Sequence, residues 1–385
     1  MAMLLDDDSC YRAMRARDLR FDGRFFVAVA STRIYCRPVC TARMPRRENC
    51  HFYATIAAAE AAGYRACLRC RPKMSSPGKA DAIAYSRSGK LSVSRSKSSR
   101  GPVFELDYRP PYDWKSMLAF LAARAVAGVE QIHNGAYRRT VGLRRDGREH
   151  LGWIEVSPAE KKSALRVVMS RSLAETAPEV LDRVRRLMDV AANPAEIAAG
   201  LGRLAKSHPG LRVPGAFDGF EVGVRAILGQ QVSVAAARTV AGRFASAFGT
   251  PVGSPFASLN TVFPAPEKIA QLTVDDIARL GVLAARSRSI IALAGAIADG
   301  TIQLVPRTDV AAELEKLRAL PGIGEWTAQY IAMRALDWPD AFPHTDFGVM
   351  KALGETNPER VLKRAQPWRP WRAYAVMHLW RSLHA

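Results

Sequence analysis

The hydrophobic pattern of the C-terminal half predicts two helices separated by a glycine turn. Leucines recur at helical spacing over residues 311–320, and residues 326–336 contain neither proline nor glycine. Between these segments stands Pro321-Gly322-Ile323-Gly324, in which the glycines relax the limits on φ. The pattern therefore predicts a helix, a tight turn and a second helix.

The pattern differs ahead of residue 176. Residues 103–108 alternate between apolar and polar side chains, as a strand does, and Asp113 is suited to cap a helix over 114–126. Further strand-like segments follow at 136–143, 152–156 and 164–169. We expect a small α+β sheet domain over 103–175 with a scaffolding role and no chemistry of its own. An all-α domain without strands is expected over 176–385.

The cysteines indicate a metal site in the N-terminal segment. All six precede residue 71, and four of them form two close pairs: Cys36, Cys40, Cys67 and Cys70. Four sulfur ligands at this spacing suit the tetrahedral coordination of Zn²⁺. We therefore expect a small zinc-binding α/β module over 1–74 that holds one structural Zn²⁺, with free buried thiols as the alternative. Cys10 and Cys50 lack the spacing and are expected to be bystanders.

Composition favours a polyanionic partner and an intracellular protein. The 385 residues predict two or three domains, and a net charge of +20 points to nucleic acid, with an anionic membrane surface as the rival. There is no apolar run of about eighteen residues to span a membrane. The acidic run Asp6-Asp7-Asp8 argues against a signal peptide, so a soluble, cytoplasmic protein that does not bind membranes is expected.

Residues 75–102 interrupt this organisation. The segment is rich in serine and in basic residues, its single acid is Asp81, and it shows no hydrophobic period. We expect a disordered basic linker between the zinc module and the sheet domain.

The predicted glycine turn is a candidate DNA-binding element. The backbone N–H groups of Gly322 and Gly324 stand at the start of a helix, where they can bind an anion such as a phosphate. The alternative is an ordinary corner between two helices.

Residues 320–330 resemble the helix-hairpin-helix signature of DNA base-excision glycosylases, and Asp346 follows where those enzymes carry an aspartate. The similarity to the 3-methyladenine DNA glycosylase II family extends over about 103–385. It implies a helix-hairpin-helix glycosylase domain that flips an alkylated base out of duplex DNA. In this family the aspartate, here Asp346, stabilises positive charge on the sugar; the alternative role for Asp346 is a helix N-cap.

The same resemblance implies roles for other residues. Trp326, Tyr330 and Trp380 would form an aromatic pocket, and Gln230 and Gln231 would contact DNA and fill the gap left by the flipped base. Because relatives that also cleave the strand carry lysine where this chain has Trp326, a monofunctional enzyme that leaves an abasic site is expected. The family also implies a monovalent cation bound by carbonyls of the hairpin turn.

The segment around the first cysteine pair looks like the zinc domain of the Ada family. The resemblance lies in residues 22–29, 34–40, 46–49 and 62–65, and it implies that Cys36 accepts a methyl group from a DNA methylphosphotriester in a single turnover. Basic side chains crowd this pair and would grip the DNA backbone, or else form a solvated face: Arg33, Arg37, Arg46 and Arg47.

One element of the Ada family has no room in this chain. Ada-like proteins follow the zinc domain with a helix-turn-helix DNA reader that is far longer than residues 75–102. The leading hypothesis is therefore a monomeric alkylation-repair fusion of a methyl-accepting zinc domain with a glycosylase. The alternatives are a transcription regulator of the adaptive response, and a glycosylase whose zinc module only binds damaged DNA.

Overall fold

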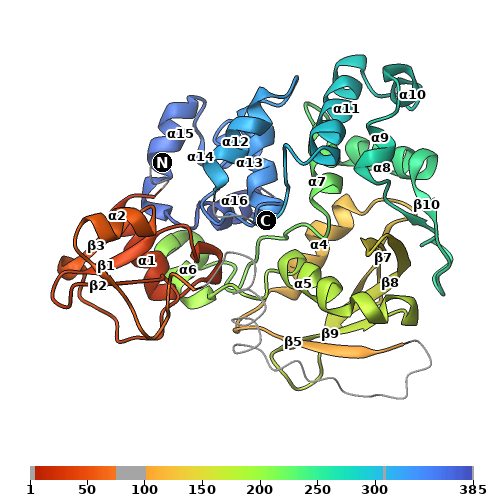
Figure 1. Ribbon diagram of the computed structural model, residues 1–385. Coiled ribbons are helices and arrows are strands. Elements are labelled where there is room, and N and C mark those ends of the chain that lie inside the picture. The colour runs from red at the N-terminus through yellow and green to blue at the C-terminus, as the bar shows by residue number, and fades with distance from the viewer. Residues whose placement is uncertain (1–4, 75–100, 307–308, 384–385) are drawn as a thin grey trace.

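The computed structural model describes residues 5–74, 101–306 and 309–383 (Figure 1). Residues 75–100, which make up nearly all of the predicted linker, lie outside the described part of the chain. Among the described residues, no helix is long and apolar enough to cross a membrane.

The N-terminal module is a four-stranded sheet with two helices, which lies at the left of Figure 1. The strand order is β3-β1-β2-β4, and β2 and β4 are parallel. The first helix begins after Asp6, whose side chain accepts a hydrogen bond from the Ser9 backbone N–H. The elements are α1 (Asp7–Ala16), β1 (Phe26–Val29), β2 (Ile34–Cys36), β3 (Cys50–Tyr53), α2 (Ile56–Ala61) and β4 (Arg65–Ala66).

The second domain is a five-stranded antiparallel sheet of order β5-β9-β8-β7-β6. As predicted, Asp113 caps the first helix, α4 (Trp114–Arg124), by accepting from the Ser116 N–H. The strand β6 was not predicted. The strands are β5 (Val103–Asp107), β6 (Glu130–His133), β7 (Ala136–Arg145), β8 (Arg148–Pro158) and β9 (Ala164–Met169).

The core of the sheet domain continues beyond residue 175. Helix α5 (Ala177–Leu187) buries Val180, Leu181 and Val184 in the same apolar cluster as the sheet, together with Phe217. The third domain is helical, as predicted. It nevertheless includes one two-stranded ribbon, β10 (Thr250–Pro251) with β11 (Thr261–Val262), so the expectation that it contains no strands was wrong.

The helices of the third domain surround one large core that also receives apolar residues of the N-terminal module. They are α6 (Pro194–Leu201), α7 (Gly219–Leu228), α8 (Val234–Phe248), α9 (Pro266–Ile269), α10 (Val274–Ala278), α11 (Ala284–Ala298), α12 (Val310–Ala319), α13 (Glu325–Arg334), α14 (Phe347–Leu353), α15 (Pro358–Arg364) and α16 (Arg372–Ser382).

A buried polar network joins the N-terminal module to the helical domain. The Arg20 guanidinium donates to Asp18 at 2.9 and 2.6 Å, to Asp189 at 3.2 Å and to the Tyr374 hydroxyl at 2.5 Å. The Tyr374 hydroxyl in turn donates to Asp189 at 2.7 Å. Beside the network, Phe21 packs edge-on against Trp338. The module is therefore docked on the helices through a buried, ion-paired interface.

Candidate active site and metal centre

The predicted hairpin is present between α12 and α13. Gly322 has φ +72°, and a Cβ there would lie 2.3 Å from the Ser289 hydroxyl oxygen, so the turn requires glycine at this position. Ile323 is buried and anchors the turn in the core. Gly324 is exposed, and a Cβ added to it would meet no atom within 4 Å. The turn thus presents open backbone at the N-terminus of α13.

The two glutamines that follow α7 differ in their contacts. The Gln230 amide donates to the Gly322 carbonyl and to the Thr327 hydroxyl, both at 2.9 Å, and so ties its loop to the hairpin. Gln231 is exposed and has φ +53°, an uncommon conformation for a residue with a side chain. Of the two predicted DNA contacts, Gln230 braces the hairpin and Gln231 is the one displayed to solvent.

A cavity of about 930 Å³ opens beside these residues. Its walls come from the end of α4, from α7 and α8, from the hairpin and α13, from the start of α14 and from the end of α16. The structure brings the predicted catalytic aspartate and all three predicted pocket aromatics to it: Trp326, Tyr330, Asp346 and Trp380.

The carboxylate of Asp346 is held by three donors. Its Oδ2 accepts from the Trp326 indole N–H at 2.8 Å, and its Oδ1 accepts from the Trp380 indole N–H at 2.8 Å. Oδ1 also accepts from the Val349 backbone N–H at 2.9 Å, which makes Asp346 the N-cap of α14. Asp346 therefore caps a helix, which was the alternative role, and lies on the cavity wall at the same time.

The aromatic wall is a stack of rings. Trp326 and Tyr330 are stacked with centroids 5.4 Å apart, and Tyr330 lies 6.4 Å from Trp380. Phe120 of α4 stacks on Trp380 at 6.3 Å, and the Arg124 guanidinium lies 3.8 Å from the Phe120 ring centroid. Because Arg124 also lines the cavity, the sheet domain contributes to the site and is not scaffolding alone.

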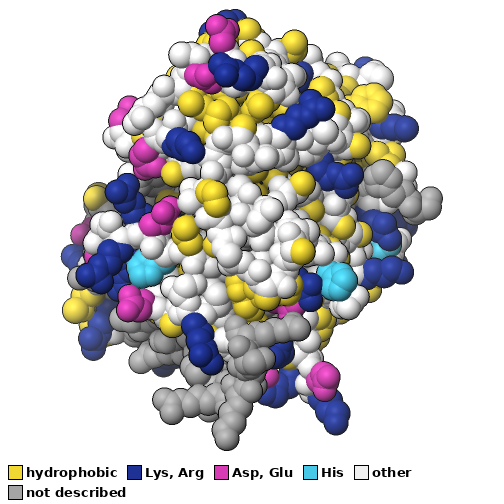
Figure 2. All heavy atoms as spheres, turned by 90° about the vertical axis from the view of Figure 1, so that its right-hand side faces the viewer, with side chains coloured by type: hydrophobic (Ala, Val, Ile, Leu, Met, Phe, Trp, Pro, Cys, Tyr) yellow, Lys and Arg dark blue, Asp and Glu magenta, His cyan; other side chains and the backbone are white. Residues whose placement is uncertain are grey.

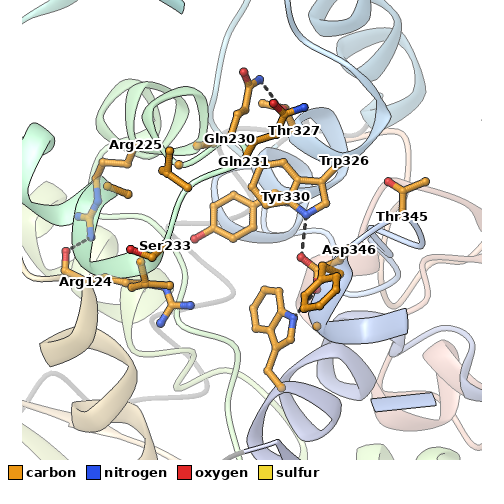
Figure 3. A pocket seen from close by; sticks show the side chains of 18 of the residues that line it. Arg124, Arg225, Gln230, Gln231, Ser233, Trp326, Thr327, Tyr330, Thr345 and Asp346 are labelled. Carbon is orange, nitrogen blue, oxygen red and sulfur yellow. Dashed lines mark hydrogen bonds between the residues drawn. The ribbon is translucent and has the colours of Figure 1, made fainter. Parts of the chain in front are cut away.

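Arg124 and Arg225 lie across the cavity from Asp346, with Tyr330 between them (Figure 3). The Tyr330 hydroxyl accepts from Arg334 at 2.8 Å, and Arg225 donates to the Arg124 carbonyl at 2.6 Å. Burial opposes ionisation of Tyr330, yet the three guanidinium groups lower its pKa below the ordinary value. The cavity therefore has a carboxylate on one side, the arginines Arg124 and Arg225 on the other and aromatic rings between them.

The four predicted ligands converge in the N-terminal module. The sulfur atoms of Cys36, Cys40, Cys67 and Cys70 all lie within 4.8 Å of one another. The parallel pairing of β2 with β4 causes this, since the Cys67 N–H donates to the Tyr35 carbonyl and sets the two pairs side by side. Sulfurs around a tetrahedral Zn²⁺ are separated by about 3.8 Å, given Zn–S bonds of about 2.3 Å, so this set fits zinc.

The remaining two cysteines lie outside the cluster. Cys10 and Cys50 are buried in the core that the module shares with the helices. Burial raises the pKa of the Cys10 thiol, and the Cys50 thiol donates to the Arg46 carbonyl at 3.3 Å.

The arginines predicted to grip DNA differ in their surroundings. Arg37 forms a largely buried ion pair with Asp22, which fixes the chain next to Cys36. Arg47 pairs with Asp8 at 2.9 Å and with Asp7 at 3.7 Å. Arg33 is exposed and lies over the Tyr64 ring, and Arg46 has 84% of its side chain exposed.

Basic side chains are spread over the face of the molecule seen in Figure 2 and outnumber the acidic ones on it. This distribution accords with the net charge of +20. A surface of this kind favours a polyanion over an acidic or neutral protein partner.

Three family models match the chain. Residues 9–73 match the metal binding domain of Ada, residues 103–218 match the AlkA N-terminal domain, and residues 224–379 match the HhH-GPD superfamily of base excision DNA repair proteins. The AlkA N-terminal match includes α5 and Phe217, in line with the extent of the sheet-domain core.

Two curated relatives align with this chain over nearly their whole length. A probable bifunctional transcriptional activator/DNA repair enzyme AlkA of Mycobacterium tuberculosis is 32% identical, over 98% of this chain and 97% of its own. That alignment is 491 positions long against 385 residues here, so at least 106 positions of the relative have no counterpart. DNA-3-methyladenine glycosylase 2 of Escherichia coli is 37% identical, over 72% of this chain and 96% of its own.

A solved structure supports the fold of the two larger domains. The 3-methyladenine DNA-glycosylase from Archaeoglobus fulgidus superposes with a TM-score of 0.59 at 19% identity, over 73% of this chain and 98% of that one. The family models and the relatives account for the cavity, the hairpin and the cysteine cluster together. The chain belongs to the AlkA family of helix-hairpin-helix base excision DNA repair proteins, and it carries the metal-binding domain of Ada at its N-terminal end.

Proposed function

We propose that the chain is a DNA alkylation-repair enzyme whose cavity hydrolyses the N-glycosidic bond of alkylated bases of the 3-methyladenine type in duplex DNA. The observation that carries this is Asp346, a carboxylate held on the cavity wall by two indole N–H groups, beside a glycine hairpin suited to a phosphate. The two relatives named above bear repair functions in their names.

The reaction needs little from the protein besides position and charge. The nucleotide rotates out of the stack into the cavity, and the base leaves with the electron pair of the glycosidic bond. Positive charge then develops on the sugar, where the Asp346 carboxylate stabilises it. Water adds to the sugar and loses a proton, so the products are the free base and an abasic site.

The aromatic wall selects the lesion by its charge. Alkylated purines carry positive charge, and an electron-rich ring face attracts a cation by about 0.5–2 kcal/mol. Trp326, Tyr330 and Trp380 offer such faces. A pocket of this kind discriminates by charge more than by hydrogen-bond pattern, which suits several alkylated bases.

The DNA lies across the hairpin and the start of α8. Residues 231–236 are exposed and include small side chains that permit close approach of a backbone. Gly322 and Gly324 of the hairpin are exposed as well. Gln231 enters the space vacated by the flipped nucleotide. The net charge of +20 favours the phosphate backbone.

Release of free 3-methyladenine from methylated duplex DNA, detected by chromatography, tests the glycosylase proposal. Strands should stay intact until alkali is added, because none of the described residues that line the cavity is a lysine able to form a Schiff base. Absence of base release would refute the proposal, and direct strand cleavage would refute the monofunctional mechanism.

Gln231→Gly is expected to slow single-turnover base release about tenfold, because it deletes the inserting side chain without straining a positive φ. The measurement is base release beside 2-aminopurine fluorescence, which reports flipping. The neighbouring change Gln230→Ala should instead lower the melting temperature, since two hydrogen bonds to the hairpin are worth about 1 kcal/mol each. Unchanged flipping in Gln231→Gly would contradict the assignment.

We also propose that Cys36 is a single-turnover methyl acceptor for DNA methylphosphotriesters. Support comes from the four-cysteine cluster and from the match to the Ada domain. Cys36, Cys40, Cys67 and Cys70 would hold Zn²⁺, which keeps a ligand sulfur ionised at neutral pH. The Cys36 sulfur forms the new bond to the methyl carbon, the carbon–oxygen bond to the phosphotriester breaks, and the electron pair stays on the phosphodiester oxygen.

Incubation with duplex DNA that carries methylphosphotriesters is expected to add the mass of one methyl group to the intact protein, and Cys36→Ala should stay unmodified. Cys10→Ala is a matched control, because that buried thiol lies outside the cluster. Zinc removal should also abolish the transfer. No mass change alongside normal base release would leave the module with a binding or structural role.

A transcription-regulator function is the weaker candidate. The Mycobacterium tuberculosis relative has at least 106 positions without a counterpart here, and the segment between zinc module and sheet domain is too short for a helix-turn-helix reader.

We further propose that the protein acts as a monomer in the cytoplasm on the nucleoid. A monovalent cation at the hairpin carbonyls also belongs to the proposal; the Gly322 carbonyl already accepts from Gln230.

A further inference from the structure

We propose that Gly348 is a positioning residue for the catalytic carboxylate: the absence of a side chain there lets the Trp380 indole N–H reach Asp346. The inference rests on the proposed glycosylase function. It assigns Gly348 and Trp380 a joint task, which is to fix the direction in which the Asp346 carboxylate faces the cavity.

The backbone does not explain the glycine. Gly348 is the second residue of α14 and is absent from the residues with positive φ, so any amino acid could adopt its conformation. Glycine inside a helix costs about 1 kcal/mol relative to alanine. The reason for this glycine therefore lies in what surrounds it.

The space beside Gly348 is filled by the site. A Cβ on Gly348 would lie 2.9 Å from Trp380 Cδ1, 3.2 Å from Trp380 Nε1 and 3.1 Å from Asp346 Oδ1. These atoms flank the hydrogen bond between the Trp380 indole and Asp346 Oδ1, which is 2.8 Å long. A methyl group here would push directly against that bond.

Trp380 has little freedom to yield. Phe120 stacks on it at 6.3 Å, Tyr330 lies 6.4 Å away, and the Arg124 guanidinium is 6.0 Å from its ring centroid. Oδ1 is also constrained, because the Val349 N–H binds the same oxygen. An added methyl group at 348 should thus break the indole contact, leaving Asp346 held by Trp326 on Oδ2 and by the helix N-terminus on Oδ1.

The test compares Gly348→Ala, Trp380→Phe and the double variant. Trp380→Phe keeps an aromatic ring but removes the N–H. Each single change should slow single-turnover base release by about tenfold, as expected for one lost hydrogen bond to a charged group, with duplex affinity retained. If both changes remove the same contact, the double variant should be no slower than the slower single one.

A purely structural role for Gly348 would give a different result, in which the losses multiply or affinity falls with rate. Gly295→Ala in α11 is the matched control: a Cβ there meets nothing within 4 Å, and its rate should equal that of the unaltered protein. Gly348→Ala at the unaltered rate would overturn the proposal. If that variant does not fold, normal release by Trp380→Phe overturns it.

A second readout does not depend on activity. With ¹⁵N-labelled tryptophan, the Trp380 indole resonance is identified by its loss in Trp380→Phe. In Gly348→Ala it should shift and exchange faster with solvent, because its acceptor is displaced. An unchanged, protected resonance would refute the proposal even if the protein released no base, whereas failure of the unaltered protein to release base would refute only the proposed function.

Discussion

Asp346→Asn is expected to reduce release of 3-methyladenine by about three orders of magnitude while the duplex dissociation constant stays within about twofold. The change replaces a negative charge with a neutral amide at the point where the sugar becomes cationic. It removes an interaction that matters only in the transition state, so the rate should fall without loss of binding. The measurements are single-turnover base release and fluorescence anisotropy with a methylated duplex.

The local structure makes asparagine an informative substitution. Asparagine is a good N-cap, so its oxygen can keep the bonds that Oδ1 accepts from Val349 and Trp380. Its amide would face the Trp326 indole N–H, so that one contact is lost as well. Asp309→Asn serves as the control, because Asp309 caps α12 in the same way outside the cavity. Base release by Asp346→Asn at the unaltered rate would eliminate Asp346 as the catalytic group.

Arg20→Ala is expected to destabilise the whole protein by about 3–5 kcal/mol, the usual cost of removing one partner from a buried ion pair. Burial alone would lower the pKa of Arg20, but Asp18, Tyr374 and Asp189 raise it well above the ordinary value. Without the guanidinium, two buried carboxylates, those of Asp18 and Asp189, would lose their shared counter-charge. Thermal melting, followed together with glycosylase activity after mild heating, measures the effect.

Arg15→Ala is the matched comparison at the same interface. Arg15 pairs with Glu196 of α6 at 3.1 Å, but 49% of its side chain is exposed, so the loss should stay below about 1 kcal/mol. Equal melting temperatures for the two variants would contradict a buried, stabilising role of the Arg20 network. A melt in which only the N-terminal module unfolds would contradict the shared core.

The sequence predicted those parts of the site that local patterns encode. The helix after Gly324, the strand at Ala164–Met169 and the Asp113 cap all appear where periodicity and capping chemistry placed them. The spacing of the two cysteine pairs predicted the metal site, and the parallel pairing of β2 with β4 brings the four sulfurs together. Asp346 was identified through the resemblance of the hairpin, and of the aspartate that follows it, to base-excision glycosylases.

Features that depend on tertiary contacts could not be predicted in this way. Phe120 and Arg124 stand one helical turn apart in a segment that looked like scaffold. Only the packing of α4 against α16 stacks Phe120 on Trp380 and places Arg124 on the cavity wall. A cation beside an aromatic ring at that spacing is the signal that could have revealed them. Trp326 and Trp380 were expected as stacking surfaces, and their N–H bonds to Asp346 depend on three helices meeting.

The docking of the zinc module was also invisible in the sequence. The sequence around Leu19-Arg20-Phe21 has the pattern of a surface segment. It does not reveal that Asp189 and Tyr374 lie against Arg20. Arginine is rarely buried unless it is paired. Asp18 is close in the sequence, but two of the three partners of Arg20, Asp189 and Tyr374, stand more than a hundred residues away.

The shared core bears on the role of the peptide that joins the zinc module to the sheet domain. Phe21, Phe25 and Val27 belong to the same apolar cluster as the helices, so contacts rather than covalent continuity hold the module in place. A polypeptide ending at residue 74 and another beginning at 101 would have the complementary surfaces needed to reassemble as a split protein. The module is therefore not an independent domain on a linker. To transfer it to another protein, the surface of the helical domain on which it packs would have to be transferred as well.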